Sequence, residues 1–166
     1  MSWLTRVRQR LPFLPKRHTP DNLWHKCRGC GQMLFTKEFE ENLSVCPKCD
    51  FHDRIGPDAR FDQLFDCSYH RLPATPVSED PLKFRDSKRD TGRLKAARAT
   101  TREQDAFVNA VGEIEGQTVV IGVQNFAFMG GSMGQAVGTA FVAGARAGVE
   151  RKAPFIVFSA AGGART

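Results

Sequence analysis

The sequence has 166 residues, of which 41% are hydrophobic and 25% charged, and its formal net charge is +6. This length allows one domain plus a small module, and the composition is typical of a soluble protein. The longest apolar run, residues 155–161, is far too short to span a membrane. A basic chain suits an anionic partner, which can be a nucleic acid, a nucleotide-bearing cofactor or an acidic protein.

Residues 1–21 predict a flexible basic arm. The first twenty residues include five that are basic and none that is acidic, and three prolines interrupt the apolar positions. This pattern does not resemble a secretory signal. Without an export signal, and with cysteines that we expect to be reduced, the chain is predicted to reside in the cytosol or a compartment of similar redox state.

Residues 22–56 contain the most specific motif of the chain, two Cys-x-x-Cys pairs separated by residues 31–45. The four cysteines are Cys27, Cys30, Cys46 and Cys49. Two such pairs can place four thiolates at the corners of a tetrahedron, which is the closed geometry of a structural zinc site. A single iron ion in the same cage is an alternative, whereas two disulfides would leave Cys67 unpaired.

The spacer between the cysteine pairs predicts a zinc ribbon. Residues 32–35 and 42–45 have the pattern of short strands, with a polar turn at 37–41. A module of this size has no sizeable core, so the metal must supply much of its folding free energy. We expect the site to be covered by Trp24, Phe35 and Val45.

Residues 57–105 predict a connector of helical and charged segments. A short helix is expected over 57–72, because its apolar side chains recur at i, i+3 and i+4. These side chains are Phe61, Leu64 and Phe65. Cys67, just beyond them, is expected to be a small buried hydrophobic residue.

Two polar segments complete the connector. Three prolines within residues 73–81 indicate a linker. Residues 82–105 carry eight basic and four acidic side chains, which is typical of a solvated helix face.

Residues 106–166 predict the first part of an α/β domain. Strands are expected at 107–114 and 117–126, joined by a turn at Glu115-Gly116. A helix over 133–150, capped by Ser132, should lead to a strand at 155–158 that is buried on both faces. The last two strands are expected to be parallel, with a right-handed crossover.

Two glycine stretches, 130–134 and 162–165, each follow a predicted strand. Glycines at such positions leave backbone N–H groups uncovered, and these can hold a phosphate or the negative oxygen of an enolate. Neither stretch has the spacing of a Walker loop or of a dinucleotide fingerprint. The alternative is that the glycines serve turns and close packing. Because sixty residues cannot enclose a doubly covered sheet, we expect the natural protein to continue beyond residue 166.

Five motifs follow one another in a fixed order along the chain. They are Trp24-x-Lys26-Cys27-x-x-Cys30-Gly31, Asn42-Leu43-x-Val45-Cys46-Pro47-Lys48-Cys49, Lys83-Phe84-Arg85-Asp86-Ser87-Lys88, Phe126-x-Phe128-Met129-Gly130-Gly131-Ser132-Met133-Gly134 and Ser159-Ala160-x-Gly162-Gly163-Ala164-Arg165. In this set the chain resembles the N-terminal portion of the carboxyltransferase beta-subunit family of bacterial acetyl-coenzyme A carboxylase. The resemblance implies an α/β (α+β) protein in which a zinc ribbon precedes a crotonase-like domain.

The resemblance also implies an activity and its partners. Such a beta subunit joins an alpha subunit, as two alpha and two beta chains, and moves a carboxyl group from carboxybiotin to acetyl-CoA, giving malonyl-CoA for fatty-acid synthesis. Biotin arrives on a biotin carboxyl carrier protein after biotin carboxylase has acted, and no membrane is involved. The ligands implied are one structural Zn²⁺, biotin on the carrier and acetyl-CoA as substrate.

By resemblance, the reacting end lies in the glycine stretches. Gly162 and Gly163 match a strand-end loop near the acyl-CoA, where their backbone N–H groups are expected to stabilise an enolate. Acyl-CoA or biotin contacts are expected from Gly130, Gly131, Gly134 and Arg165.

The chain departs from the family pattern at Asp90, Gly92 and Thr166, and it lacks a second glycine pair that the family has downstream. We therefore expect the isolated chain to bind zinc without transferring carboxyl groups. Two other functions fit the sequence: a nucleic-acid-binding zinc ribbon, and a carboxyltransferase for another acyl-CoA.

Overall fold

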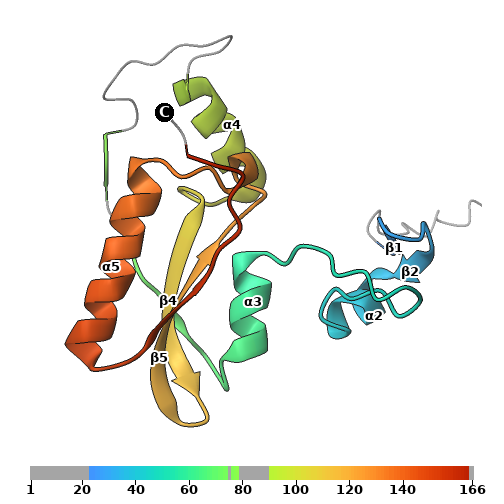
Figure 1. Ribbon diagram of the computed structural model, residues 1–166, viewed down its shortest axis with the longest axis horizontal. Helices are drawn as coiled ribbons and strands as arrows, with labels where there is room; N and C mark the ends of the chain where they lie inside the picture. Colours follow the sequence, from blue (N-terminus) through green and yellow to red (C-terminus); the bar gives the residue numbers. More distant parts are fainter. Residues whose placement is uncertain (1–22, 75, 79–89, 165–166) are drawn as a thin grey trace, which may run out of the picture. The chain divides into compact units, whose positions relative to one another are not determined.

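The computed structural model describes residues 23–74, 76–78 and 90–164 (Figure 1). It divides into two compact units, Met1–Asp53 and Arg54–Thr166. The predicted basic arm, residues 82–89 of the charged segment 82–105, Arg165 and Thr166 lie outside the described residues. Across the described ranges, no helix is both long and apolar enough to span a bilayer.

The first unit contains a two-stranded antiparallel sheet and one short helix. Strand β1 (Trp24–Lys26) pairs with β2 (Met33–Phe35), and helix α2 (Thr36–Glu41) follows directly. The polar turn expected at 37–41 is therefore wrong. Its charged residues are good helix formers, and the helix buries Phe39, on which the His25 ring stacks at 4.2 Å.

The strand expected at 42–45 is also wrong. In its place the chain turns, with positive φ at Leu43 and Ser44, and only Val45 forms an isolated antiparallel bridge, to His52. Because β1 pairs with β2, the sheet of the ribbon is closed by residues that precede the first cysteine pair.

The second unit is built on a mixed sheet in the order β3-β4-β5-β6. Its strands are His70–Arg71, Phe107–Ile114, Gln117–Gln124 and Phe155–Phe158. The predicted hairpin is confirmed: Glu115 and Gly116 both have positive φ, 51° and 72°, as a type I′ turn requires. The parallel pairing of the last two strands is confirmed as well, since β5 and β6 run in the same direction.

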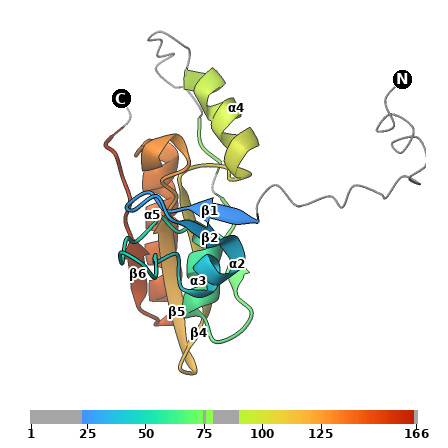
Figure 2. The same ribbon diagram turned by 90° about the vertical axis from the view of Figure 1, so that its right-hand side faces the viewer.

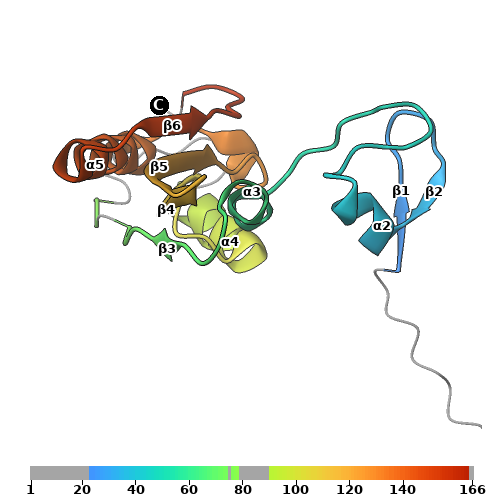
Figure 3. The same ribbon diagram turned by 90° about the horizontal axis from the view of Figure 1, so that it is seen from below.

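Helices α3 (Pro57–Leu64) and α5 (Gln135–Arg151) cover opposite faces of this sheet (Figures 2 and 3). Helix α4 (Asp90–Thr101) contributes Leu94 to the core on the α5 side. The expected shared face of α3 is confirmed, because Phe61 and Phe65 are buried against the sheet. Alternate residues of β5 serve the two faces: Ile121 packs with Phe61, whereas Gln124 lies on the other face.

Three expectations about the second unit are wrong. Helix α3 ends at Leu64, and Cys67 is exposed because Phe65 and Tyr69 take the positions against the core. Strand β6 is only partly covered: Phe155 and Val157 pack in the cluster on one face and Phe158 in that on the other, but Ile156 is 41% exposed.

The start of α5 is a further correction. Gly134, not Ser132, occupies its N-cap, and the helix begins at Gln135. The reason is that Met133 is held in extended form, where it pairs with Ala164 in a parallel bridge.

Two glycines of α5 provide a matched test of packing. A Cβ at Gly138 would meet nothing within 4 Å, so Gly138→Ala should stabilise the second unit by about 0.5–1 kcal/mol. A Cβ at Gly144 would lie 2.5 Å from Asn109 Oδ1 and 2.7 Å from the Phe155 ring, so Gly144→Ala should destabilise it by about 1–3 kcal/mol. Urea unfolding followed by far-UV circular dichroism measures both, and equal effects of the two substitutions would contradict this packing.

Candidate metal centre and glycine site

The four cysteines of the ribbon converge on one point. Their Sγ atoms all lie within 4.8 Å of one another, with Cys27–Cys49 at 3.7 Å and Cys30–Cys46 at 3.8 Å. A tetrahedron with Zn–S bonds of about 2.3 Å has edges of about 3.8 Å, so the cage fits zinc. These separations are far longer than the roughly 2.05 Å of a disulfide, and all four cysteines are free.

The two cysteine knuckles share one backbone conformation. In the first, Cys27 N–H donates to Gln32 O and Gly31 N–H donates to Cys27 O, both at 2.9 Å. The second knuckle repeats both bonds at the same lengths through Cys46, Asp50 and Phe51. Gly31 and Asp50 occupy equivalent positions and both have positive φ, 73° and 56°. The repeated turn presents two sulfurs from each side of the cage.

An acidic side chain supports the first knuckle. The side chain of Asp53 is 8% exposed and lies 3.4 Å from His25 Nε2 and 3.6 Å from Arg28 Nη1. The His25 contact is not a hydrogen bond, since Nε2 has no hydrogen-bond partner among the described residues. Asp53 thus ties the end of the ribbon back to β1 and to the loop of the first cysteine pair.

The thiols of the cage resist ionising together. Hydrogen bonds from the Cys30 and Gly29 backbone N–H groups lower the pKa of Cys27 to about 7. The Phe51 N–H acts in the same direction on Cys49, but desolvation and the three neighbouring thiols outweigh it and raise the pKa of Cys49 to about 12. Four adjacent thiolates need a cation between them, and a bound divalent metal would supply that charge.

The expected cover of the metal site is wrong for Trp24. Its side chain is 59% exposed and packs edge-on against Phe35, with ring centroids 5.9 Å apart. Phe35 and Val45 are half-buried. The metal therefore has to stabilise a module whose own apolar contacts are few.

The two glycine stretches, far apart in the sequence, lie side by side in the second unit. Gly162 N–H donates to Gly130 O at 2.8 Å, and Met133 N–H donates to Gly163 O at 3.0 Å. Gly130 and Gly131 have φ values of 68° and 65°, which turn the chain sharply after β5. The turn brings the segment before α5 alongside the segment after β6.

Gly131 permits this approach because it has no side chain. A Cβ at this position would lie 1.9 Å from Ala160 O and 3.3 Å from Ala161 Cα, so no other residue fits without separating the two stretches. Gly134 lies outside this contact and serves as the N-cap of α5.

The two predicted backbone donors differ in this structure. Gly162 N–H is already engaged with Gly130 O, whereas Gly163 N–H makes no hydrogen bond within the described part of the chain. Gly163 is exposed, with φ of 151°. Its N–H is thus available to a ligand, and the catalytic role of both residues stays a prediction.

Sequence analysis missed one side chain at this site. Gln124, at the end of β5, is 5% exposed and hydrogen-bonds to Gly131 in the first glycine stretch and to Ala160, two residues before the second. The available signal was a long polar residue ending an apolar strand directly before a glycine turn.

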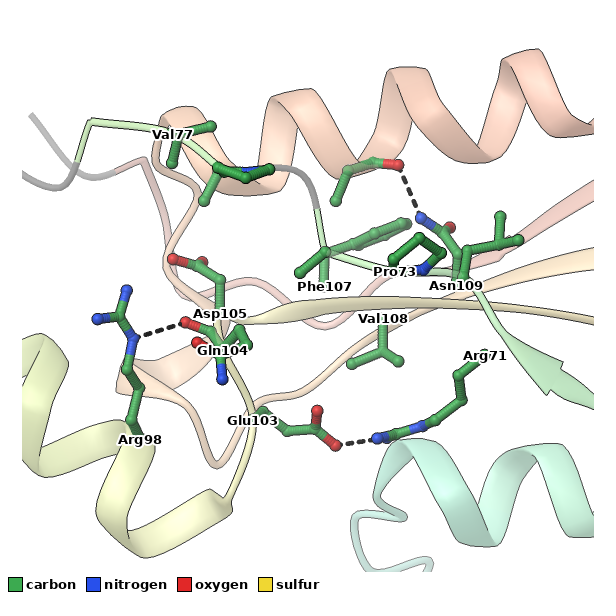
Figure 4. Close-up of a pocket in the computed structure, with 15 residues that line it drawn as sticks. Arg71, Pro73, Val77, Arg98, Glu103, Gln104, Asp105, Phe107, Val108 and Asn109 are labelled. Atoms are coloured by element: carbon green, nitrogen blue, oxygen red, sulfur yellow. Dashed lines mark hydrogen bonds and ion pairs between the residues drawn. The ribbon is translucent and has the colours of Figure 1, made fainter.

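A separate cavity of about 460 Å³ lies between the segment after β3, the start of β4 and α5 (Figure 4). None of its lining residues belongs to the glycine stretches. Its charged groups pair with neighbours, since Arg71 bonds Glu103 and Arg98 Nε donates to Gln104 O at 2.9 Å. These pairings stabilise the cavity wall and leave little charge to recognise a ligand.

Comparison with known proteins relates both sites to one group of enzymes. Residues 24–49 match the acetyl-CoA carboxylase zinc finger domain family. The acetyl-coenzyme A carboxylase carboxyl transferase subunit beta of Novosphingobium aromaticivorans is 62% identical over 99% of this chain, and that of Granulibacter bethesdensis is 49% identical over 99%. The chain spans 58% and 55% of the lengths of these two relatives.

Two solved structures also resemble the chain. Transcarboxylase 12S with hydrolysed methylmalonyl-coenzyme A is 24% identical, with a TM-score of 0.49 over 77% of this chain and 21% of its own. The beta subunit of Pseudomonas aeruginosa geranyl-CoA carboxylase is 17% identical, with a TM-score of 0.48 over 78% of this chain and 22% of its own.

The metal centre predicts that the chain binds one zinc ion, with an affinity that depends on pH. Zinc binds thiolates, and the apo site is protonated at neutral pH on Cys49, so binding should release protons and zinc affinity should rise with pH above 7. Cys46→Ser should lower zinc affinity by at least about 100-fold, as expected when one of four ligands is lost. Cys67→Ser is the matched control, since Cys67 lies outside the cage. Competition titration with a chromogenic chelator measures the zinc affinity of the unsubstituted chain and of both variants. Unchanged affinity in Cys46→Ser would contradict the site.

Proposed function

Because this chain is a homologue, over 99% of its length, of acetyl-coenzyme A carboxylase carboxyl transferase beta subunits, we propose that it takes part in carboxyl transfer from carboxybiotin to acetyl-CoA. The observation that carries the proposal is the 62% identity to one such subunit, which includes both the ribbon and the glycine stretches. The product is malonyl-CoA for fatty-acid synthesis, and the zinc has a structural role.

The chemistry requires a stabilised enolate. The methyl carbon of acetyl-CoA must lose a proton before it can attack the carboxyl carbon of carboxybiotin. The N–C bond of carboxybiotin would break in this transfer, and the freed biotin nitrogen would take up that proton. When the methyl proton is lost, negative charge develops on the thioester oxygen, where a fixed backbone N–H stabilises it at no reorganisation cost. We assign this donor to Gly163, whose N–H has no hydrogen-bond partner among the described residues, with Gly162 holding the loop through its bond to Gly130. Gly130, Gly131, Gly134 and Arg165 are proposed to contact acyl-CoA or biotin.

The proposal includes the partners of such a subunit. These are an alpha subunit, in an assembly of two alpha and two beta chains, the biotin carboxyl carrier protein and biotin carboxylase, in the cytoplasm. We infer that the second unit is the first part of a crotonase-like domain, which the mixed sheet with helices on both faces supports. A related carboxyltransferase acting on another acyl-CoA remains the nearest alternative activity.

An assay of the assembled enzyme tests the proposal. A beta subunit of the relatives' length that contains these residues, combined with its alpha subunit, should form malonyl-CoA from acetyl-CoA and a carboxybiotin donor. Gly131→Ala should lower this rate by at least about 100-fold, because it displaces the reacting loop by more than an ångström. Gly138→Ala, where a Cβ has open space, is the matched control.

Two results would contradict the assignment. Malonyl-CoA formation by the isolated 166-residue chain would show that the alpha subunit is not needed. Transfer to another acyl-CoA with none to acetyl-CoA would replace the proposed substrate.

A second candidate function, binding of single-stranded nucleic acid, is favoured by one exposed face of the ribbon. Trp24 and Lys26 are two residues apart on β1, so their side chains lie on the same face of the sheet, and Met33 pairs with Lys26 from β2. Aromatic, cationic and apolar side chains therefore share this exposed face. Trp24→Ala should weaken binding of a fluorescent oligonucleotide about tenfold, with affinity falling steeply as salt rises. Equal binding by Trp24→Ala and the unsubstituted chain would exclude this face.

A further inference from the structure

We propose that Gln124 is a positioning residue, whose buried side-chain amide holds the two glycine stretches in a single arrangement and thereby places the Gly163 N–H. The inference rests on the proposed function for its catalytic consequence, but its structural part stands on the contacts of this chain alone.

The two ends of the Gln124 amide contact the first glycine stretch and Ala160, the residue two positions before the second stretch. Its Nε2 donates to Gly131 O at 2.7 Å, and its Oε1 accepts from Ala160 N–H at 3.2 Å. The side chain is 5% exposed, so water does not compete freely for these partners. One planar amide therefore fixes the distance between a carbonyl that follows β5 and an N–H that follows β6.

The position of Gln124 in the sheet places its side chain between the two segments that it bridges. It is the last residue of β5, and its neighbour strand β6 ends at Phe158, two residues before Ala160. Its side chain lies on the α5 face, since Val123, one residue earlier, packs in the core on the α3 face. Both glycine stretches leave the sheet at this end, and Gln124 is the buried side chain between them.

The bridge needs a side chain that can both donate and accept a hydrogen bond. An apolar side chain of the same length would leave Gly131 O and Ala160 N–H without their partner in a largely buried setting, at the full cost of desolvation. The stretches would then be joined by only two backbone hydrogen bonds, from Gly162 and from Met133. Ala160 lies three residues before Gly163, so a shift at Ala160 moves the N–H that the proposed mechanism needs.

Gln124 differs in this respect from the other buried amide of the sheet. Asn109, on β4, is also 5% exposed, but its Nδ2 donates to Ala140 O in α5 at 2.7 Å, and neither glycine stretch contacts it. Asn109→Leu therefore removes a buried amide from the same sheet without touching the glycine stretches, and it is the matched control for Gln124→Met.

The first experiment measures steady-state kinetics in the assembled enzyme. Gln124→Met should lower kcat by about 10- to 100-fold with KM for acetyl-CoA within about threefold, because the substrate still binds but meets a misplaced donor. Asn109→Leu should leave kcat within about threefold. If the two variants lower kcat equally, the effect of Gln124 is general destabilisation and the proposal is overturned.

A conservative variant, Gln124→Glu, adds a second measurement: the pH dependence of kcat, which general destabilisation would not change. In Gln124→Glu, the protonated acid can donate to Gly131 O and accept from Ala160 N–H, whereas the carboxylate can only accept. The kcat of Gln124→Glu relative to the unsubstituted enzyme should therefore approach one at low pH and fall as pH rises. A ratio that is independent of pH while Gln124→Met is impaired would overturn the proposal.

The second experiment tests whether Gln124 holds the two glycine stretches together, independently of carboxyl transfer. Amide hydrogen exchange of Ala160, Gly162 and Met133 in the 166-residue chain should be at least tenfold faster in Gln124→Met than in Asn109→Leu. Equal rates would overturn the proposal even if the enzyme transfers carboxyl groups. If the unsubstituted enzyme shows no carboxyl transfer, the proposed function fails, and the exchange rates alone then decide whether Gln124 holds the stretches.

Discussion

The arrangement of the two glycine stretches depends on one close backbone contact, between Gly131 and Ala160. It is possible only where a residue lacks Cβ, since that atom would lie 1.9 Å from Ala160 O. Around it, Gln124 and the backbone bonds of Gly162 and Met133 join the two glycine stretches into one unit. The start of α5 follows from the same contact, because Met133 must stay extended to pair with Ala164.

The two units of the chain are stabilised by different physics. The second has two apolar clusters, one on each face of a four-stranded sheet. The first buries few large side chains, and its fold is closed by four sulfurs that need a cation to share their charge. Loss of metal should therefore unfold the ribbon while leaving the sheet of the second unit intact.

Features set by local chemistry were predictable from the sequence. The Cys-x-x-Cys spacing identified the metal cage, Glu115-Gly116 identified the hairpin, and Phe61 with Phe65 identified the buried face of α3. Each depends on residues close together in the chain, whose spacing alone determines the geometry.

Features set by distant partners were not predictable. Ser132 is a good capping residue, but pairing of Met133 with Ala164 moves the helix start past it. The run 155–158 is apolar enough for a doubly covered strand, yet its exposure depends on which neighbours surround it. The bridging role of Gln124 required knowledge that residues 131 and 160 meet.

The central claim, that the glycine stretches form one packed unit, can be tested by proton–proton contacts in solution. A nuclear Overhauser effect should connect the α-proton of Gly131 that occupies the Cβ direction with the α-proton of Ala161, since the Cβ site lies 3.3 Å from Ala161 Cα. A clear cross-peak in the unsubstituted chain is the result that the account predicts. If that cross-peak is missing while the contacts across the β4–β5 hairpin are present, the two stretches are not held together and the account is wrong.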